Sequence, residues 1–162
     1  MPKIDTLQVS LRGENEVEIT RNFPGPRNLL FDCHTKPDLV RRWLFGFDGW
    51  KLAVCDIDLR GSGRYRYEWQ EIATGNSMGM GGSFREVVPN ELLVTTELFD
   101  EDWTGGETIV TTRFLGDGNT SRIEMVILYS SAAAREAALK TGMTDGMEFS
   151  YQRLDGLLAG TP

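Results

Sequence analysis

Apolar residues recur every three or four positions near the end of the chain and every second position over much of the rest. The first pattern covers residues 131–159. Its apolar positions are Leu139, Met143, Met147, Tyr151, Leu154 and Leu158. On a helix these positions form one stripe, which is stable only against another apolar surface. We therefore predict a long C-terminal helix with its apolar face packed on the remaining chain.

The alternating pattern predicts β-strands upstream of this helix, separated by turn residues such as Gly61-Ser62-Gly63. The predicted strands are residues 16–23, 50–60, 64–71, 77–88, 91–99, 108–115 and 120–129. Residues 7–11 also alternate, and part of that stretch is a further candidate strand. Because sequential strands with short turns pair antiparallel, one antiparallel sheet is expected. Many glycines in 77–88 favour strong curvature or a bulge there.

Two short helices are predicted between the strands at residues 16–23 and 50–60. Residues 27–34 follow Pro26, and residues 37–44 begin at Pro37, both places where proline suits a first helical turn. The order predicts one α+β domain over residues 1–162, with its core in 16–159. In this fold a curved antiparallel sheet of about six to seven strands wraps around the C-terminal helix. A curled sheet that grips a helix leaves space between them, and the pattern leaves open whether side chains fill it.

Composition narrows the classes of function. The formal net charge of −7 argues against a broad nucleic-acid surface. No apolar run is long enough for a membrane span, and the N-terminus lacks an apolar segment of the signal-peptide kind, so a cytoplasmic location is expected. Cys33 and Cys55 are then expected to be buried free thiols. Neither a metal site nor a cofactor is predicted, because no second histidine or cysteine stands at ligand spacing.

Aromatic and methionine side chains are the candidates for lining a ligand pocket. Thioethers adapt to varied ligands, and the N–H or O–H of Tyr67, Trp69 and Tyr151 is suited to orienting one. Plain core packing is the alternative for the same residues. The candidate ligand-binding residues are Trp43, Trp50, Tyr67, Trp69, Met78, Met80, Phe84, Met125, Met143, Met147 and Tyr151.

No catalytic residue is predicted. His34 is the only histidine, and its place at the end of a short helix favours a solvated side chain. Glu97, Arg113 and Glu124 lie on strands, and their facing stays open because residues 91–99 are apolar in both registers. A charge turned into the cavity would need a partner and would point to function. Asp58 and Arg60 are expected to form an ion pair at a turn.

Several motifs in fixed order resemble a known family. They include Arg21-x-Phe23-x-x-Pro26-Arg27, then Asp58-x-Arg60-x-x-Gly63-x-Tyr65-Arg66, then Gly82-x-Phe84-x-Glu86-Val87-x-Pro89, and finally Thr141-Gly142-Met143-x-x-Gly146. Together they resemble the START-like SRPBCC superfamily, in the branch named after the activator of heat-shock protein 90 ATPase. The resemblance implies a helix-grip fold with a deep cavity; superfamily members bind lipids, sterols and polyketides, and some are cyclases. Two departures stand out: the family often has paired tryptophans where this chain has Trp43-Leu44, and often has Gly-Trp in the last helix where this chain has Gly146-Met147.

Three hypotheses follow from the residues and the resemblance. The favoured one is a binding protein that holds a small, largely apolar molecule between sheet and helix, and that has no assigned reaction. The second is a chaperone-linked interaction module, using the outer sheet or the acidic loop with Trp103. The third is a polyketide cyclase-like enzyme, for which no converging acid and base are found. A homodimer is a further expectation.

Overall fold

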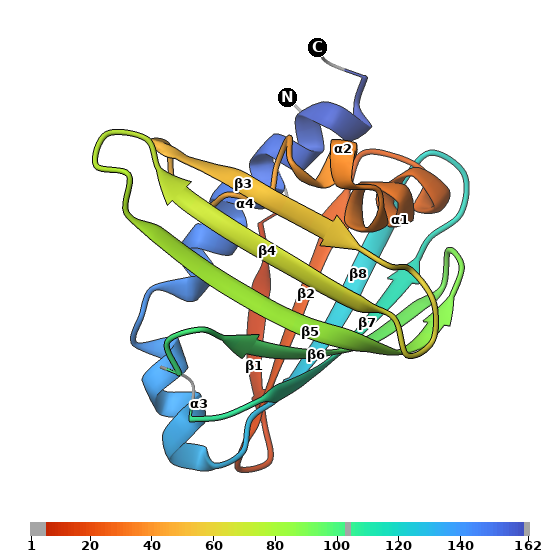
Figure 1. The fold of residues 1–162 in the computed structure, drawn as a ribbon. Helices are drawn as coiled ribbons and strands as arrows, with labels where there is room; N and C mark the ends of the chain where they lie inside the picture. Colours follow the sequence, from red (N-terminus) through yellow and green to blue (C-terminus); the bar gives the residue numbers. More distant parts are fainter. Residues whose placement is uncertain (1–5, 103–104, 161–162) are drawn as a thin grey trace.

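The alternating segments form one antiparallel sheet in the computed structural model, which describes residues 6–102 and 105–160. Its eight strands are arranged in the order β1-β2-β8-β7-β6-β5-β4-β3 (Figure 1). The strands are β1 (Gln8–Arg12), β2 (Glu16–Phe23), β3 (Trp50–Ile57), β4 (Arg64–Glu71), β5 (Ser77–Val88), β6 (Leu92–Phe99), β7 (Thr108–Leu115) and β8 (Ser121–Leu128). The strand count is slightly higher than the expected six to seven because β1, the candidate strand of the lead-in, pairs with β2.

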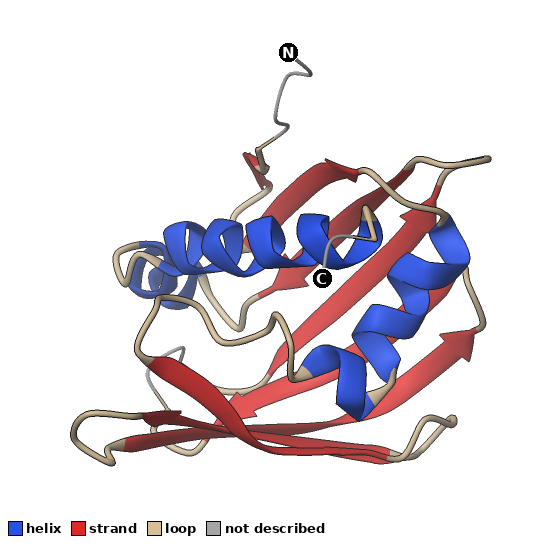
Figure 2. Cartoon of the chain, turned by 90° about the horizontal axis from the view of Figure 1, so that it is seen from above, coloured by secondary structure: helices blue, strands red, loops and turns tan. Residues whose placement is uncertain are grey.

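The helices lie on the concave side of this sheet, as Figure 2 shows. Helix α1 (Arg27–Thr35) and α2 (Pro37–Val40) connect β2 to β3, as predicted, although α2 ends earlier than expected. After Val40 the chain continues in tight turns, with the Trp43 and Leu44 amides both bonded to the Val40 carbonyl. Helix α4 (Met143–Leu158) crosses the concave face, so the predicted grip of sheet on C-terminal helix is confirmed.

The prediction of one unbroken helix over residues 131–159 is wrong. Helix α3 (Ala132–Leu139) begins at Ser131, whose side chain accepts a hydrogen bond from the Ala134 amide, as expected of a helix cap. The chain then turns at Gly142, whose φ of 79° lies in the left-handed region that glycine tolerates, and α4 begins. Leu139 and Met143 lie on either side of this turn but are four residues apart, which is also the spacing within one helix. The apolar pattern therefore gives no sign of the break.

A buried ion cluster fixes α4 on the sheet. The Arg21 guanidinium, at the inward face of β2, binds Glu148 with Nε and Nη2 at 2.9 Å each. It also binds both oxygens of Asp155, at 2.7 and 2.8 Å. The Arg21 side chain is 0% exposed, and its guanidinium lies 5.6 Å from the centre of the Tyr151 ring. The cluster therefore sets where α4 sits, and hence how much space remains beneath it.

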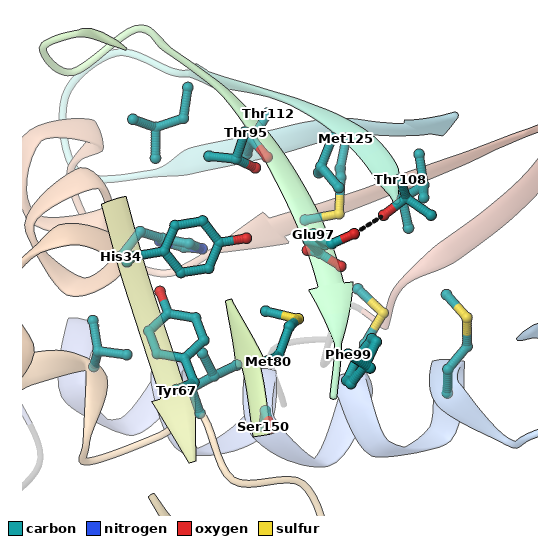
Figure 3. A pocket seen from close by; sticks show the side chains of 18 of the residues that line it. His34, Tyr67, Met80, Thr95, Glu97, Phe99, Thr108, Thr112, Met125 and Ser150 are labelled. Carbon is teal, nitrogen blue, oxygen red and sulfur yellow. Dashed lines mark hydrogen bonds between the residues drawn. The ribbon is translucent and has the colours of Figure 1, made fainter. Parts of the chain in front are cut away.

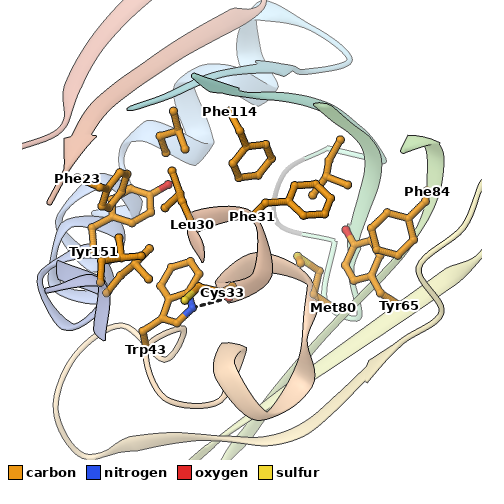
Figure 4. Close-up of a cluster of buried hydrophobic side chains, with 14 residues drawn as sticks. Phe23, Leu30, Phe31, Cys33, Trp43, Tyr65, Met80, Phe84, Phe114 and Tyr151 are labelled. Atoms are coloured by element: carbon orange, nitrogen blue, oxygen red, sulfur yellow. Dashed lines mark hydrogen bonds between the residues drawn. The ribbon is translucent and has the colours of Figure 1, made fainter. Parts of the chain in front are cut away.

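The space under the helices is filled at one end. Around α1 and the C-terminal half of α4, aromatic and aliphatic side chains pack in edge-on contacts, as Figure 4 shows. Phe31 meets Phe114 with ring centres 5.2 Å apart, and Phe23 meets Tyr151 at 5.3 Å. Such contacts add to the stability gained from burial alone. The candidate site adjoins this cluster and shares Trp43, Tyr65, Met80, Phe84 and Tyr151 with it.

Strand β5 curves where its glycines predict. The pairing register of β5 and β6 shifts between Phe84 and Glu86. At Gly82 a Cβ atom would lie 1.8 Å from the Thr96 carbonyl oxygen and 2.8 Å from the Tyr65 hydroxyl. Only glycine permits this close approach, which lets the Tyr65 hydroxyl donate to the Thr96 carbonyl.

Candidate functional site

A cavity of about 280 Å³ lies between the sheet and α4. Its volume is close to the lower end of the range for small-molecule pockets. The lining side chains come from α1, α2 and the turns after it, α4, strands β4 to β8 and the residue that follows β8, and are mostly aromatic, aliphatic or thioether. They are His34, Val40, Trp43, Leu44, Tyr65, Tyr67, Trp69, Met80, Phe84, Leu93, Thr95, Glu97, Phe99, Thr108, Val110, Thr112, Met125, Ile127, Tyr129, Met143, Met147, Ser150 and Tyr151.

The structure brings most of the candidate ligand-binding residues to this cavity. Those in its lining are Trp43, Tyr67, Trp69, Met80, Phe84, Met125, Met143, Met147 and Tyr151. Trp50 and Met78 lie outside it. Met78 points to the same face of β5 as Met80, but it sits two residues closer to the end of the strand and is 43% exposed. Trp50 is the first residue of β3, the edge strand farthest from β8.

The two tryptophans of the cavity wall are held by hydrogen bonds to the chain. The Trp43 indole donates to the Cys33 carbonyl at 2.8 Å, and the Trp69 indole donates to the Leu44 carbonyl at the same distance. Their N–H groups are therefore occupied, and the expectation that Trp69 orients a ligand through its N–H is wrong. Both rings act as fixed apolar walls.

His34 was expected to be solvated and is instead turned inward. Its Nδ1 lies 2.8 Å from the Leu30 carbonyl oxygen, so Nδ1 donates and Nε2 is the unprotonated nitrogen of the neutral ring. Trp43 and Phe114 pack edge-on against the ring. Burial lowers the pKa of His34 to about 4, so the side chain is neutral at physiological pH. Its spacing from Leu30 and Phe31, one turn earlier, is the signal that could have indicated this inward face.

Glu97 is the acidic side chain of the cavity. It projects inward from β6, as Figure 3 shows, and burial raises its pKa to about 7. Within the described ranges its carboxylate has neither a hydrogen bond nor an ion pair. The sequence also left open which way Arg113 and Glu124 face. Thr112 and Met125, the neighbouring pair, line the cavity, so the paired residues Arg113 and Glu124 lie on the opposite face of the sheet. Only Glu97 of these three therefore faces the cavity.

Four tyrosines surround the same space, and two of them offer hydroxyls to a ligand. Tyr65 donates to the Thr96 carbonyl, and the Tyr129 hydroxyl donates to the Met143 sulfur at 3.4 Å. For Tyr67 and Tyr151 no hydroxyl partner is found in residues 6–102 and 105–160. Burial raises the pKa of all four, that of Tyr129 to about 12, so each phenol stays protonated. The expected orienting role thus remains open to Tyr67 and Tyr151.

The loop after α2 is bound to α4 beside the cavity. Ser150 of α4 lines the cavity and accepts a hydrogen bond from the Gly46 amide at 2.9 Å. Arg153 binds Asp48 at 2.9 Å, and its guanidinium lies 3.8 Å above the centre of the Phe45 ring. Helix α4 therefore holds the loop as well as the sheet.

The remaining candidate groups have structural roles. Cys33 and Cys55 are buried free thiols, as predicted, with pKa values raised to about 11 by burial. Asp58 and Arg60 form the expected turn ion pair at 2.9 Å. In the described ranges no cluster of three or more histidine, cysteine or acidic side chains could hold a metal ion. No helix of that same part of the chain is long and apolar enough to cross a membrane. Trp103, central to the interaction hypothesis, lies outside the described residues.

An antiparallel sheet that grips a C-terminal helix around an internal cavity defines the helix-grip class of α+β domains. A family profile described as Activator of Hsp90 ATPase homolog 1-like protein matches residues 24–159. The chain therefore belongs to this family, AHSA1, as the motifs indicated.

Solved structures agree with this assignment. A Rhodobacter sphaeroides protein is 31% identical, with a TM-score of 0.90 over 96% of this chain and 99% of that one. A Nitrosomonas europaea protein is 21% identical, with a TM-score of 0.80 over 93% of this chain and 97% of its own. An AHSA1-like protein from Aeromonas hydrophila is 14% identical, with a TM-score of 0.68 over 90% and 95% of the two chains. Comparison with curated proteins gives no match.

Proposed function

We propose that this protein binds a small, largely apolar molecule in the cavity between the sheet and α4. The observation that carries the proposal is the cavity itself, about 280 Å³ of space with walls of fixed aromatic rings and adaptable thioethers. Trp43 and Trp69 are locked by hydrogen bonds, so they offer a preformed surface. A preformed surface lowers the ordering cost that a ligand meets on binding.

The tryptophan indole N–H signals give a direct test with an internal control. Toluene or indole added to the protein is expected to shift the signals of Trp43 and Trp69, which line the cavity, in a correlation NMR spectrum. The signal of Trp50, outside the cavity, should stay in place. Saturable shifts confined to the two wall tryptophans would support the proposal. Unchanged spectra, or equal drift of all signals, would contradict it.

A pair of neighbouring threonines provides matched variants. Thr112 lines the cavity, whereas Thr111, the residue before it on β7, faces the other side of the sheet. Thr112→Phe is expected to fill the space and weaken toluene binding about tenfold or more, while Thr111→Phe keeps wild-type affinity. Overpacking costs about 1–3 kcal/mol, which leaves a folded protein to measure by calorimetry. Equal effects of the two variants would contradict a cavity site.

A chaperone contact is the second candidate, supported by the description of the family as Activator of Hsp90 ATPase homolog 1-like. Stimulation of a bacterial chaperone ATPase by the protein would distinguish it from ligand binding. A cyclase-like reaction has weaker support, because Glu97 and His34 enter the cavity from different elements and no hydrogen bond joins them. A cytoplasmic location and a homodimer remain predictions.

A further inference from the structure

The Glu97 carboxylate receives no counter-charge from the cavity. No lysine or arginine is among the lining residues, and His34 is neutral at physiological pH. In the described part of the chain the carboxylate also accepts no hydrogen bond. Buried ionisable groups in folded proteins are normally paired, because an unpaired one costs several kcal/mol of desolvation. We therefore expect a ligand bound in this cavity to supply the partner of the Glu97 carboxylate.

The rings around Glu97 favour a positive partner. Trp43, Trp69, Tyr67 and Tyr151 line the same space, and Phe99 lies two residues further along β6 on the same face as Glu97. The faces of aromatic rings attract cations, and most strongly where water is excluded. Figure 3 shows Tyr67 and Glu97 both pointing into the cavity, from β4 and from β6. Carboxylate and rings together suit a cationic group attached to an apolar body.

We propose that the molecule bound in this cavity carries a protonated amine, which pairs with the Glu97 carboxylate while its apolar part packs against the tryptophan and methionine walls. This inference rests on the proposed function and narrows its ligand class. Carboxylic acids such as fatty acids are disfavoured, because two like charges would meet without a cation between them. Tyr67 and Tyr151 line the same cavity, and phenol oxygens can accept further hydrogen bonds from an ammonium.

The inference predicts a specific pH dependence, since the amine needs the ionised carboxylate. The titratable groups that face Glu97 are the phenols of Tyr65, Tyr67, Tyr129 and Tyr151, and the His34 imidazole. The phenols stay protonated, and His34 stays neutral, between about pH 5 and pH 9. Arg21, behind Tyr151, is already paired with Glu148 and Asp155. Amine affinity should therefore fall as the pH drops through the range in which Glu97 gains its proton.

A matched series of three probes tests the inference by calorimetry. Phenethylamine, phenethyl alcohol and phenylacetate share one apolar body and differ in the charge of the end group. At about pH 8 the amine is expected to bind the wild-type protein about tenfold or more tightly than the alcohol, and the acid most weakly. The amine preference should shrink at about pH 5. Glu97→Gln should bring the ratio of amine to alcohol affinity close to one.

Glu124→Gln is the control, because that carboxylate lies on the opposite face of the sheet, and it should keep the wild-type preference. If the alcohol binds and the amine binds no more tightly than the alcohol, the amine inference is overturned and the cavity proposal stands. If Glu97→Gln leaves the preference intact, the amine inference is likewise overturned. If none of these probes nor toluene binds, the cavity proposal itself fails, and the amine inference fails with it.

Discussion

Replacing Arg21 with methionine is expected to lower the free energy of unfolding by about 3–5 kcal/mol. The substitution keeps an unbranched apolar stem but removes the guanidinium that binds both Glu148 and Asp155. The two carboxylates are then left near each other, largely buried and without their cation, which is the costly outcome for a buried ion cluster. Denaturant unfolding followed by circular dichroism measures the change.

Arg12→Met is the matched control for Arg21→Met. Arg12 forms a single ion pair with Glu18 on the exposed edge of the sheet, so its loss should cost less than about 1 kcal/mol. Adding Glu148→Gln and Asp155→Asn to Arg21→Met should recover part of the stability, because the unpaired charges are removed as well. The assigned role of the cluster is refuted if Arg21→Met is as mild as Arg12→Met.

Replacing Glu97 with glutamine is expected to stabilise the protein, with a gain that grows between about pH 5 and about pH 7 and is absent at more acidic pH. Folding raises the pKa of this carboxyl from 4.5 to about 7, through burial. Below pH 4.5 the Glu97 side chain is protonated in both the folded and the unfolded protein, so it does not change the free energy of unfolding. As the pH rises past 4.5, the unfolded chain loses the proton first, so stability declines until the folded carboxyl also ionises near pH 7.

The expected gain for Glu97→Gln is about 2 kcal/mol at about pH 8, and close to zero at about pH 4. The glutamine amide is itself a buried polar group, so the gain is smaller than the full shift in pKa would give. Unfolding curves at several pH values measure it, with Glu124→Gln as the control on the outer face. A loss of stability in Glu97→Gln at pH 8, or a gain that does not vary with pH, would contradict an unpaired buried carboxylate.

Most of the fold could be predicted from the sequence because its strands alternate and its turns are marked by glycine. The observed bounds of β2, β4, β5 and β7 coincide with the alternating segments, since one face of each is buried and the register is then set by the side chains. The break before α4 could not be predicted. Gly142 interrupts the helix at a step that keeps the apolar spacing, and spacing alone does not report backbone dihedrals.

The candidate site could be predicted less fully than the fold, because the sequence did not show where its charged residues lie. Aromatic and methionine residues were placed at the cavity because alternation fixes their face. The inward facing of Glu97 was open, because both faces of β6 carry apolar residues. The ion cluster of Arg21 depends on two residues more than a hundred positions away in the chain, and no local pattern indicates such a pairing.

The central claim is that the space between the sheet and α4 is open to apolar guests. Crystals of the protein placed under xenon pressure test it directly, because xenon enters apolar cavities and scatters strongly. The account predicts xenon between Met125, Met147 and the Trp69 ring, and loss of that peak in Thr112→Phe. Xenon found elsewhere on the protein, with none between sheet and helix, would contradict it.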